Sequence, residues 1–190
     1  MSTRNVRILA FAGSSRAGSY NVRLLAHAVE LLRARGADVD VLDLGALDLP
    51  LYNADDEAAH GVPAGVQRLR EEMRAHDALL IASPEYNCFF TPLLKNAIDW
   101  ASRPDPGQPS PFAGKFAALL AASPGALGGV RGLPALRILL SNLGVLVLPG
   151  QLAVPLAHEA FADDGSLRDA RLEKTLGEVV GALLTAFKPA

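Results

Sequence analysis

Short, mostly apolar runs recur along the chain, and each one is followed by a polar or glycine-rich segment. Residues 78–83 are the plainest case, because alanine, leucine and isoleucine stand there at consecutive positions. Runs of this length and composition are typical of strands that are covered on both faces, as in a parallel sheet. The strands predicted in this way are residues 6–12, 38–44, 78–83, 115–123 and 144–149.

Between the predicted strands, apolar residues recur at the three- and four-residue spacing of amphipathic helices. Gly36 is a stop signal after the first helix, and Thr91 followed by Pro92 is an N-cap with proline in the first turn. Ser166, with Asp169 three residues later, forms a partial capping box that predicts the start of the last helix. The predicted helices are residues 22–35, 63–76, 91–102, 133–143 and 166–187.

The remaining segments are predicted to be irregular. Residues 45–60 form a long loop with an apolar island at 47–52, residues 103–114 contain four prolines and form a surface loop, and residues 151–161 are extended. Strands that alternate with helices predict an α/β fold, a doubly wound five-stranded parallel sheet with helices on both faces. Because the chain shows no linker, internal repeat or low-complexity tract, we expect a single domain over residues 1–190.

Composition narrows the classes of partner and compartment. The chain has 190 residues, of which 50% are hydrophobic, and a formal net charge of -2. A mildly acidic chain without a long basic run disfavours nucleic acids and membrane surfaces as partners and favours a small molecule. The single cysteine, Cys88, excludes an intrachain disulfide and fits a reducing compartment. Residues 1–7 are polar and the apolar run after them is too short for a signal peptide or a membrane span, so we expect a cytoplasmic protein.

The loop after the first predicted strand, residues 13–21, has the composition of a phosphate site. In doubly wound sheets, ligands bind beyond the carboxyl ends of the strands, where the strand order reverses. Ser14, Ser15 and Ser19 supply hydroxyls, and the start of the following helix supplies free N–H groups. Asn21 adds an amide, and Arg16 adds a full charge that suits a dianion.

Other interpretations of this loop remain open. A Walker loop needs lysine and then serine or threonine after Gly18, where Ser19 and Tyr20 stand. A dinucleotide fingerprint needs glycine where Ser15 stands, although Asp43 at the end of the second strand keeps a dinucleotide-binding enzyme without flavin as an alternative. A purely structural alternative is a hydrophilic turn that caps the helix, because serine and asparagine are ordinary N-cap residues.

Two further loops suit a flat heterocycle. Residues 84–87 offer backbone N–H groups on a turn, an aromatic face at Tyr86 and an amide at Asn87. Residues 123–129 are rich in glycine, which lets the backbone approach a ring without Cβ clashes. The three loops together predict one ligand, with its phosphate near the first strand and its ring between the third and fourth strands.

The segments GSSRAGSYN, PEYN followed by LKNAIDW, and SPGALGG, in this order and at these intervals, resemble the NADPH-dependent FMN reductase family of the flavodoxin-like fold, the group that contains chromate, quinone and azo-dye reductases. The similarity extends over about residues 6–184. It implies FMN as the cofactor and NADPH or NADH as the co-substrate. The residues that it implies for the FMN phosphate are Ser14, Arg16, Ser19 and Asn21, with Tyr20 as a further cofactor-binding residue. Those for the isoalloxazine ring are Pro84, Glu85, Tyr86 and Asn87, and those that close the side of the fourth strand are Ser123, Gly125 and Gly128.

The sequence departs from the family pattern directly after PEYN. Family members usually carry small residues there, whereas this chain has Cys88, Phe89 and Phe90. The two aromatic side chains would either reshape the pocket over the flavin or pack into the core. We expect Cys88 to be a small buried hydrophobe without a redox role.

The apolar island at 47–52 favours a homodimer or homotetramer, because exposed apolar patches usually meet a partner, although local packing would also explain it. Lys95 and Asp99 form an i,i+4 pair with a structural role. The histidines show no metal-ligand spacing, so no metal site is predicted.

The leading functional hypothesis is an FMN-dependent oxidoreductase. It would take hydride from NADPH or NADH and pass the electrons to a small-molecule acceptor, namely a quinone, a flavin, an azo compound or a metal ion. This chemistry requires no acid, base or nucleophile from the protein, so no catalytic side chain is predicted. The alternative is a flavodoxin-like electron carrier or redox sensor that binds FMN without NAD(P)H turnover, but carriers of this fold tend to be strongly acidic and a charge of -2 argues against it.

Overall fold

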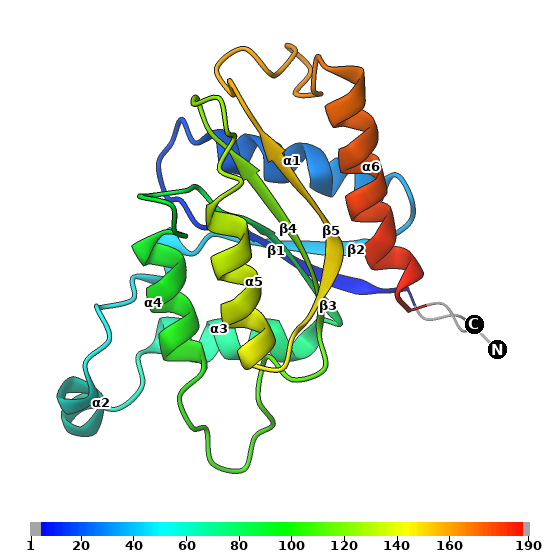
Figure 1. Cartoon of the computed structure of the whole chain (residues 1–190). Coiled ribbons are helices and arrows are strands. Elements are labelled where there is room, and N and C mark those ends of the chain that lie inside the picture. Colours follow the sequence, from blue (N-terminus) through cyan, green and yellow to red (C-terminus); the bar gives the residue numbers. More distant parts are fainter. Residues whose placement is uncertain (1–4, 188–190) are drawn as a thin grey trace.

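A computed structural model describes residues 5–187, and within them five parallel strands form one sheet in the order β2-β1-β3-β4-β5 (Figure 1). Helices cover both faces, which is the flavodoxin-like α/β fold that the sequence predicts. The strands are β1 (Arg7–Ala12), β2 (Asp38–Leu42), β3 (Ala78–Ala82), β4 (Phe116–Ala122) and β5 (Leu146–Val154), and the helices are α1 (Tyr20–Arg33), the 3₁₀ helix η1 (Gly45–Leu47), α2 (Ala54–His60), α3 (Ala64–Ala75), α4 (Pro92–Ala101), α5 (Gly132–Asn142) and α6 (Ala170–Thr185). No helix among the described residues is long and apolar enough to cross a bilayer. The two ends of the predicted single domain, residues 1–4 and 188–190, lie outside the described residues.

The strands alternate their side chains between two hydrophobic cores. In β1, Ile8 and Ala10 face the layer of α1 and α6, whereas Leu9 and Phe11 face the layer of α3, α4 and α5 (Figure 1). All four side chains are at most 3% exposed. Because both faces of the sheet are covered, its central strands are apolar at consecutive positions, and this is why they were predictable.

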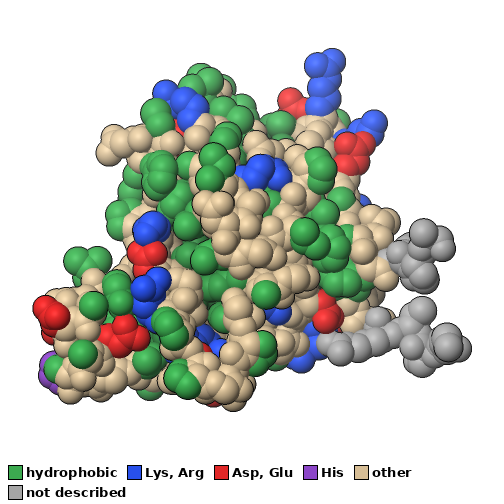
Figure 2. All heavy atoms as spheres, turned by 60° about the horizontal axis from the view of Figure 1, so that its bottom comes forward, with side chains coloured by type: hydrophobic (Ala, Val, Ile, Leu, Met, Phe, Trp, Pro, Cys, Tyr) green, Lys and Arg blue, Asp and Glu red, His purple; other side chains and the backbone are tan. Residues whose placement is uncertain are grey.

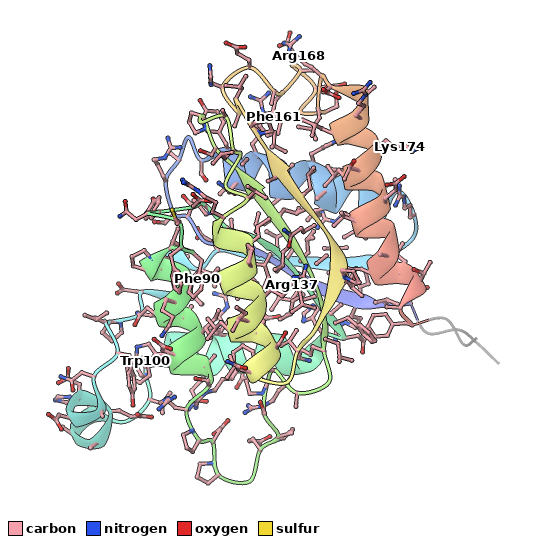
Figure 3. All side chains as sticks on the ribbon, viewed as in Figure 1. Phe90, Trp100, Arg137, Phe161, Arg168 and Lys174 are labelled. Carbon is pink, nitrogen blue, oxygen red and sulfur yellow. The ribbon has the colours of Figure 1, made fainter. Side chains whose placement is uncertain are left out.

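The last strand continues well past its predicted end. Residues 144–149 were expected, but β5 runs to Val154 and shifts its register against β4 at a bulge. Pro149, which has no N–H to donate, is tolerated in an edge strand with such a bulge. Arg137 of α5 donates to the carbonyls of Val147 (3.0 Å) and Leu148 (2.8 Å), and Figure 3 shows its side chain between α5 and β5.

Two helix predictions are wrong. The expected loop at residues 45–60 contains η1 and α2, and Asn53 caps α2 by accepting a backbone N–H of its first turn (2.9 Å). The last helix begins at Ala170, because Asp169 is its N-cap and accepts from the N–H of Arg171 (2.7 Å). Ser166, the predicted cap, instead donates its hydroxyl to Asp164 (2.6 Å) within a turn.

Candidate cofactor site

The strand order reverses between β1 and β3, which are neighbours in the sheet. In doubly wound folds this reversal leaves a crevice at the carboxyl ends of the strands. A concavity opens at this place, and three loops contribute to it, those after β1, β3 and β4. Its lining residues are Ser14, Arg16, Ser19, Tyr20, Asn21, Pro84, Glu85, Tyr86, Ala122, Ser123 and Pro124.

Thr91 joins the loop after β1 to the loop after β3. As the N-cap of α4 it accepts the N–H of Leu94 (3.3 Å), and its hydroxyl donates to the carbonyl of Gly13 (2.7 Å). A Cβ on Gly13 would lie 2.8 Å from the Thr91 hydroxyl oxygen, so only glycine allows this approach. The start of α4 therefore fixes the spacing of the two loops.

The loop after β1 presents an unpaired positive charge. Within residues 5–187 the guanidinium of Arg16 has no hydrogen bond or ion pair, and it lies 6.0 Å from the centroid of the Tyr20 ring. The hydroxyl oxygen of Ser14 accepts the N–H of Arg16 (3.4 Å) and bends the loop. Because the first N–H groups of α1 also point out of the helix, this end of the concavity suits an anion.

Ser19 and Asn21 take part in the fold as well as in the site. Ser19 is the N-cap of α1 and accepts the N–H of Val22 (3.4 Å), which leaves its hydroxyl hydrogen for another acceptor. Asn21 is 3% exposed, and its amide donates to the carbonyl of Ala122 (2.8 Å) and accepts the N–H of the same residue (2.9 Å). The Asn21 side chain thus joins α1 to the end of β4, and its backbone N–H is the group that it can offer to a phosphate.

The PEYN segment ends in a two-residue hairpin. Tyr86 and Phe89 exchange backbone hydrogen bonds of 2.8 and 3.0 Å, and the residues between them, Asn87 and Cys88, have φ values of 53° and 64°. Positive φ at both central residues is the geometry of a type I′ turn, for which asparagine followed by glycine is preferred. The hairpin therefore holds Tyr86 at the rim of the concavity and places Asn87 at the tip, outside the lining.

The three residues that depart from the family pattern have different environments. Phe90 is 4% exposed and packs in the core of α4 and α5, where Figure 3 labels it, whereas Phe89 is 50% exposed and lies against Phe90 with ring centroids 4.3 Å apart. Cys88 is exposed at the turn. The expectation of a buried cysteine is wrong, because the left-handed turn directs this residue out of the core.

Glu85 joins the hairpin to the loop after β4. Its side chain is 8% exposed, and its carboxylate accepts the N–H groups of Arg131 (2.8 Å) and Gly132 (2.9 Å) at the start of α5. The guanidinium of Arg131 binds the other carboxylate oxygen (3.0 and 2.9 Å). These contacts join the two loops that the sequence assigns to a ring.

Of the two predicted glycines after β4, Gly128 is also required by the packing of the loop. Gly125 donates its N–H to the Ser123 hydroxyl oxygen (3.2 Å), and Gly128 has a φ of 63°. A Cβ on Gly128 would lie 2.7 Å from the Pro155 nitrogen, so this glycine lets the loop rest on the end of β5. Ser123 lines the concavity, but Gly125 and Gly128 do not. Ala122 and Pro124 line it without having been predicted, because alanine at a strand end and proline in a loop carry no chemical signal.

Arg70 and Lys115 are buried at the opposite end of the sheet, where the strands begin. Burial lowers the pKa of Arg70, which donates to the carbonyls of Trp100 (3.0 Å) and Arg103 (3.1 Å). Burial also lowers the pKa of Lys115, whose ammonium donates to the carbonyl of His76 (2.5 Å). Arg70 joins α3 to the end of α4 and the loop that follows, and Lys115 joins the start of β4 to the end of α3, so we interpret both shifts as structural.

The same end of the sheet has a cluster of possible metal ligands, which the sequence spacing did not indicate. Ligand-type atoms of Asp40, Glu72 and His76 lie within 4.8 Å of one another. Both ring nitrogens of His76 already have partners, the Asp40 carboxylate (2.9 Å) and the Glu72 carbonyl (2.5 Å). Because the ring nitrogens of His76 are bonded to protein groups, we do not interpret this cluster as a metal site.

Comparison with known proteins identifies the family. The model of the NADPH-dependent FMN reductase family matches residues 6–159 of the chain. The chain belongs to this family. An NAD(P)H-dependent FMN reductase of Pseudomonas aeruginosa is 42% identical over 180 residues, 94% of each chain, and a quinone reductase of Escherichia coli K12 is 34% identical over 188 residues, 97% of this chain and 95% of the other.

Among solved structures, this chain is similar to FerB, a flavoenzyme NAD(P)H:(acceptor) oxidoreductase from Paracoccus denitrificans. The TM-score is 0.81 at 33% identity, and the match covers 95% of this chain and 96% of FerB. The FMN reductase family was the one predicted from PEYN and its companion segments. The predicted cofactor is also the one that the family description names.

Proposed function

We propose that the protein is an FMN-dependent NAD(P)H oxidoreductase that delivers electrons to a small-molecule acceptor. The observation that carries this proposal is the composition of one concavity. One end has the unpaired guanidinium of Arg16 and the start of α1, and the other end has two loops that are joined by Glu85 and carry the aromatic side chain of Tyr86. A phosphorylated ligand with a flat ring matches that polarity. Family membership makes FMN the candidate.

The donors present fit FMN. The phosphate end requires cationic and N–H donors, which Arg16, Ser14 and the first turn of α1 supply. The ring end requires backbone groups that can approach a flat heterocycle, and the hairpin of Tyr86 together with the loop at Ser123 supplies them. We therefore assign phosphate binding to the loop after β1 and ring binding to the loops after β3 and β4.

The side chains bind and orient rather than react. Bound FMN supplies the hydride and electron-transfer chemistry that the amino acids lack. Arg16 neutralises the phosphate, Tyr86 stands at the rim where a nicotinamide or an acceptor would enter, and Glu85 keeps the two ring loops at a fixed separation. No proton has to be moved by a side chain for hydride transfer, so the rate depends on the alignment of co-substrate and ring.

The acceptor class that we favour is a quinone. Quinones are flat and apolar, and the hairpin at the concavity carries two exposed aromatic side chains, Tyr86 (55% exposed) and Phe89 (50% exposed), that such a molecule can stack on. Relatives bear the names quinone reductase and NADPH:quinone oxidoreductase. Free flavins, azo compounds and metal ions are the competing acceptors.

We further propose a homodimer or homotetramer in the cytoplasm. The island at residues 47–52 is partly packed on α4, since the Trp100 indole donates to the carbonyl of Pro50 (2.8 Å). Leu51 nevertheless stays 82% exposed, and Ile138 on α5 is 63% exposed. Apolar side chains also recur over the face in Figure 2. A second copy covering such residues would remove them from water.

Flavin content and reduction test the proposal. Purified protein should carry FMN or bind it when titrated, and anaerobic mixing with NADPH or NADH should bleach the flavin absorbance band at about 450 nm. Reoxidation by a panel of quinones, flavins, azo compounds and metal ions would then rank the acceptors. A protein that binds no FMN would refute the proposal, and one that binds FMN but is not reduced by either nicotinamide would be an electron carrier.

A further inference from the structure

A second concavity opens on the other side of the loop after β1. It has a volume of about 240 Å³ and is separate from the FMN concavity, but Ser14 and Arg16 line both. Its other lining residues are Ala12, Ser15, Ala17, Val22, Leu25, Val41, Leu42 and Asp43. The loop that we assign to the FMN phosphate is therefore a wall shared by two sites.

Asp43 provides the carboxylate of this second concavity. Val39 and Val41 alternate along β2, and Asp43 follows the end of the strand at the same spacing. Val39 packs in the core that α1 covers, and Val41 and Asp43 line the concavity together with Val22 and Leu25 of α1. One carboxylate oxygen of Asp43 accepts the N–H of Gly45 (2.8 Å), and the other has no partner within residues 5–187. A carboxylate at the end of the second strand is the group that dinucleotide-binding folds use for ribose hydroxyls.

The walls of the concavity are apolar and partly open to solvent. Val22 is 41% exposed and Val41 is 57% exposed, while Leu25 is buried behind them at 3%. Branched aliphatic side chains on two sides of a slot suit the faces of a purine base. The second concavity thus combines hydroxyl and guanidinium donors, a free carboxylate oxygen and apolar walls, which are the kinds of group that the phosphate, ribose and base of an adenylate require.

We propose that this second concavity binds an adenylate group, and that the protein thereby accepts FAD as well as FMN. The inference rests on the proposed function, because the FMN half of FAD would occupy the first concavity. Arg16 lines both concavities, so phosphates bound on the two sides of this loop would be neighbours. A separate nicotinamide dinucleotide would place its pyrophosphate beside the FMN phosphate dianion, and the two groups would repel each other. In FAD the two phosphates form one pyrophosphate, whose charge is lower than that of a phosphate dianion and a pyrophosphate together. Binding FAD also avoids the entropy cost of immobilising a second molecule.

The test is calorimetric titration of the apoprotein with riboflavin, FMN and FAD. Asp43→Asn keeps an oxygen for the Gly45 N–H but removes the charge, and Val41→Ser removes one apolar wall at an exposed position. We expect FAD to bind more tightly than FMN to the natural protein. The ratio of the FMN to the FAD dissociation constant should fall about tenfold in Asp43→Asn and about threefold in Val41→Ser. The ratio cancels any general effect of the lost charge on phosphate affinity.

Leu146→Ser is the matched control, because Leu146 is 55% exposed on β5 at the other edge of the sheet. It should leave the ratio unchanged. If the adenylate comes from NAD(P)H instead, the two variants will weaken NADP⁺ binding to FMN-loaded protein and leave the FAD ratio unchanged, which supports the subsite but not FAD. No effect on either ligand overturns the inference while the proposed function stands, and failure to bind any flavin refutes both.

Discussion

The two ends of the sheet gather polar side chains for different purposes. At the amino end, Arg70, His76 and Lys115 are each at most 8% exposed, and each is bonded to a backbone carbonyl or a carboxylate. At the carboxyl end, Arg16 is exposed and unpaired within residues 5–187, and Asp43 keeps one oxygen free. A satisfied, buried polar cluster holds the fold together, whereas exposed donors and acceptors that line a concavity without a protein partner are available to a ligand.

The largest expected effect tests the structural end. Arg70→Met should lower the free energy of unfolding by about 3 kcal/mol, because the carbonyls of Trp100 and Arg103 lose a buried charged donor. Urea denaturation of the apoprotein measures it. Arg68→Met, an exposed position on the same helix, is the control and should change stability by less than about 0.5 kcal/mol. Equal losses in the two variants would contradict the structural role of Arg70.

Removal of the unpaired charge of Arg16 should weaken FMN binding without changing stability. Arg16→Gln should weaken FMN binding about thirtyfold, which corresponds to the loss of one charge-assisted contact of about 2 kcal/mol. Its stability should stay unchanged, because the Arg16 side chain has no hydrogen bond or ion pair among the described residues. Fluorescence titration measures the affinity, and riboflavin, which lacks the phosphate, should bind both proteins equally.

Arg23→Gln is the matched control for this variant. Arg23 is also near the start of α1, but it donates to the carbonyl of Ala162 (2.7 Å) and lies over the ring of Phe161. We expect it to lose stability and to keep FMN affinity. If it weakens FMN as much as Arg16→Gln does, the loop after β1 does not hold the phosphate.

Glu85 combines a structural role with a place in the site, because its carboxylate is bonded to the start of α5 and it also lines the concavity. Glu85→Gln keeps an acceptor for the N–H groups of α5 but loses the ion pair with Arg131, so stability should fall by about 1 kcal/mol and FMN should bind several-fold more weakly. Arg131→Met should give a similar loss. The double variant should cost less than the sum of the two, and strict additivity would show that the pair does not act as a unit.

Local patterns predicted the elements, but contacts between distant loops had to be observed. The central strands were predictable because both of their faces are buried, and the Thr91 cap because it acts within four residues. Asn21 was expected at a phosphate because its amide suits one, yet that amide is bonded to Ala122, 101 residues away. The carboxylate of Glu85 is likewise committed to the start of α5. The residue type fixes the kind of hydrogen bond, whereas the fold decides which partner receives it.

The smallest expected effect concerns Cys88, whose exposure the sequence did not predict. In the hairpin it occupies the turn position with a φ of 64°, which glycine adopts without the steric cost that a Cβ imposes. Cys88→Gly should therefore raise the free energy of unfolding by about 0.5 kcal/mol, the strain relieved being partly offset by the freedom that glycine gains in the unfolded chain. Asn87→Gly should change it less, because asparagine already tolerates positive φ. Thermal unfolding of both apoproteins measures the difference. A destabilised Cys88→Gly variant would mean that the Cys88 side chain makes contacts worth more than the turn strain, and would place this residue with the satisfied groups of the fold.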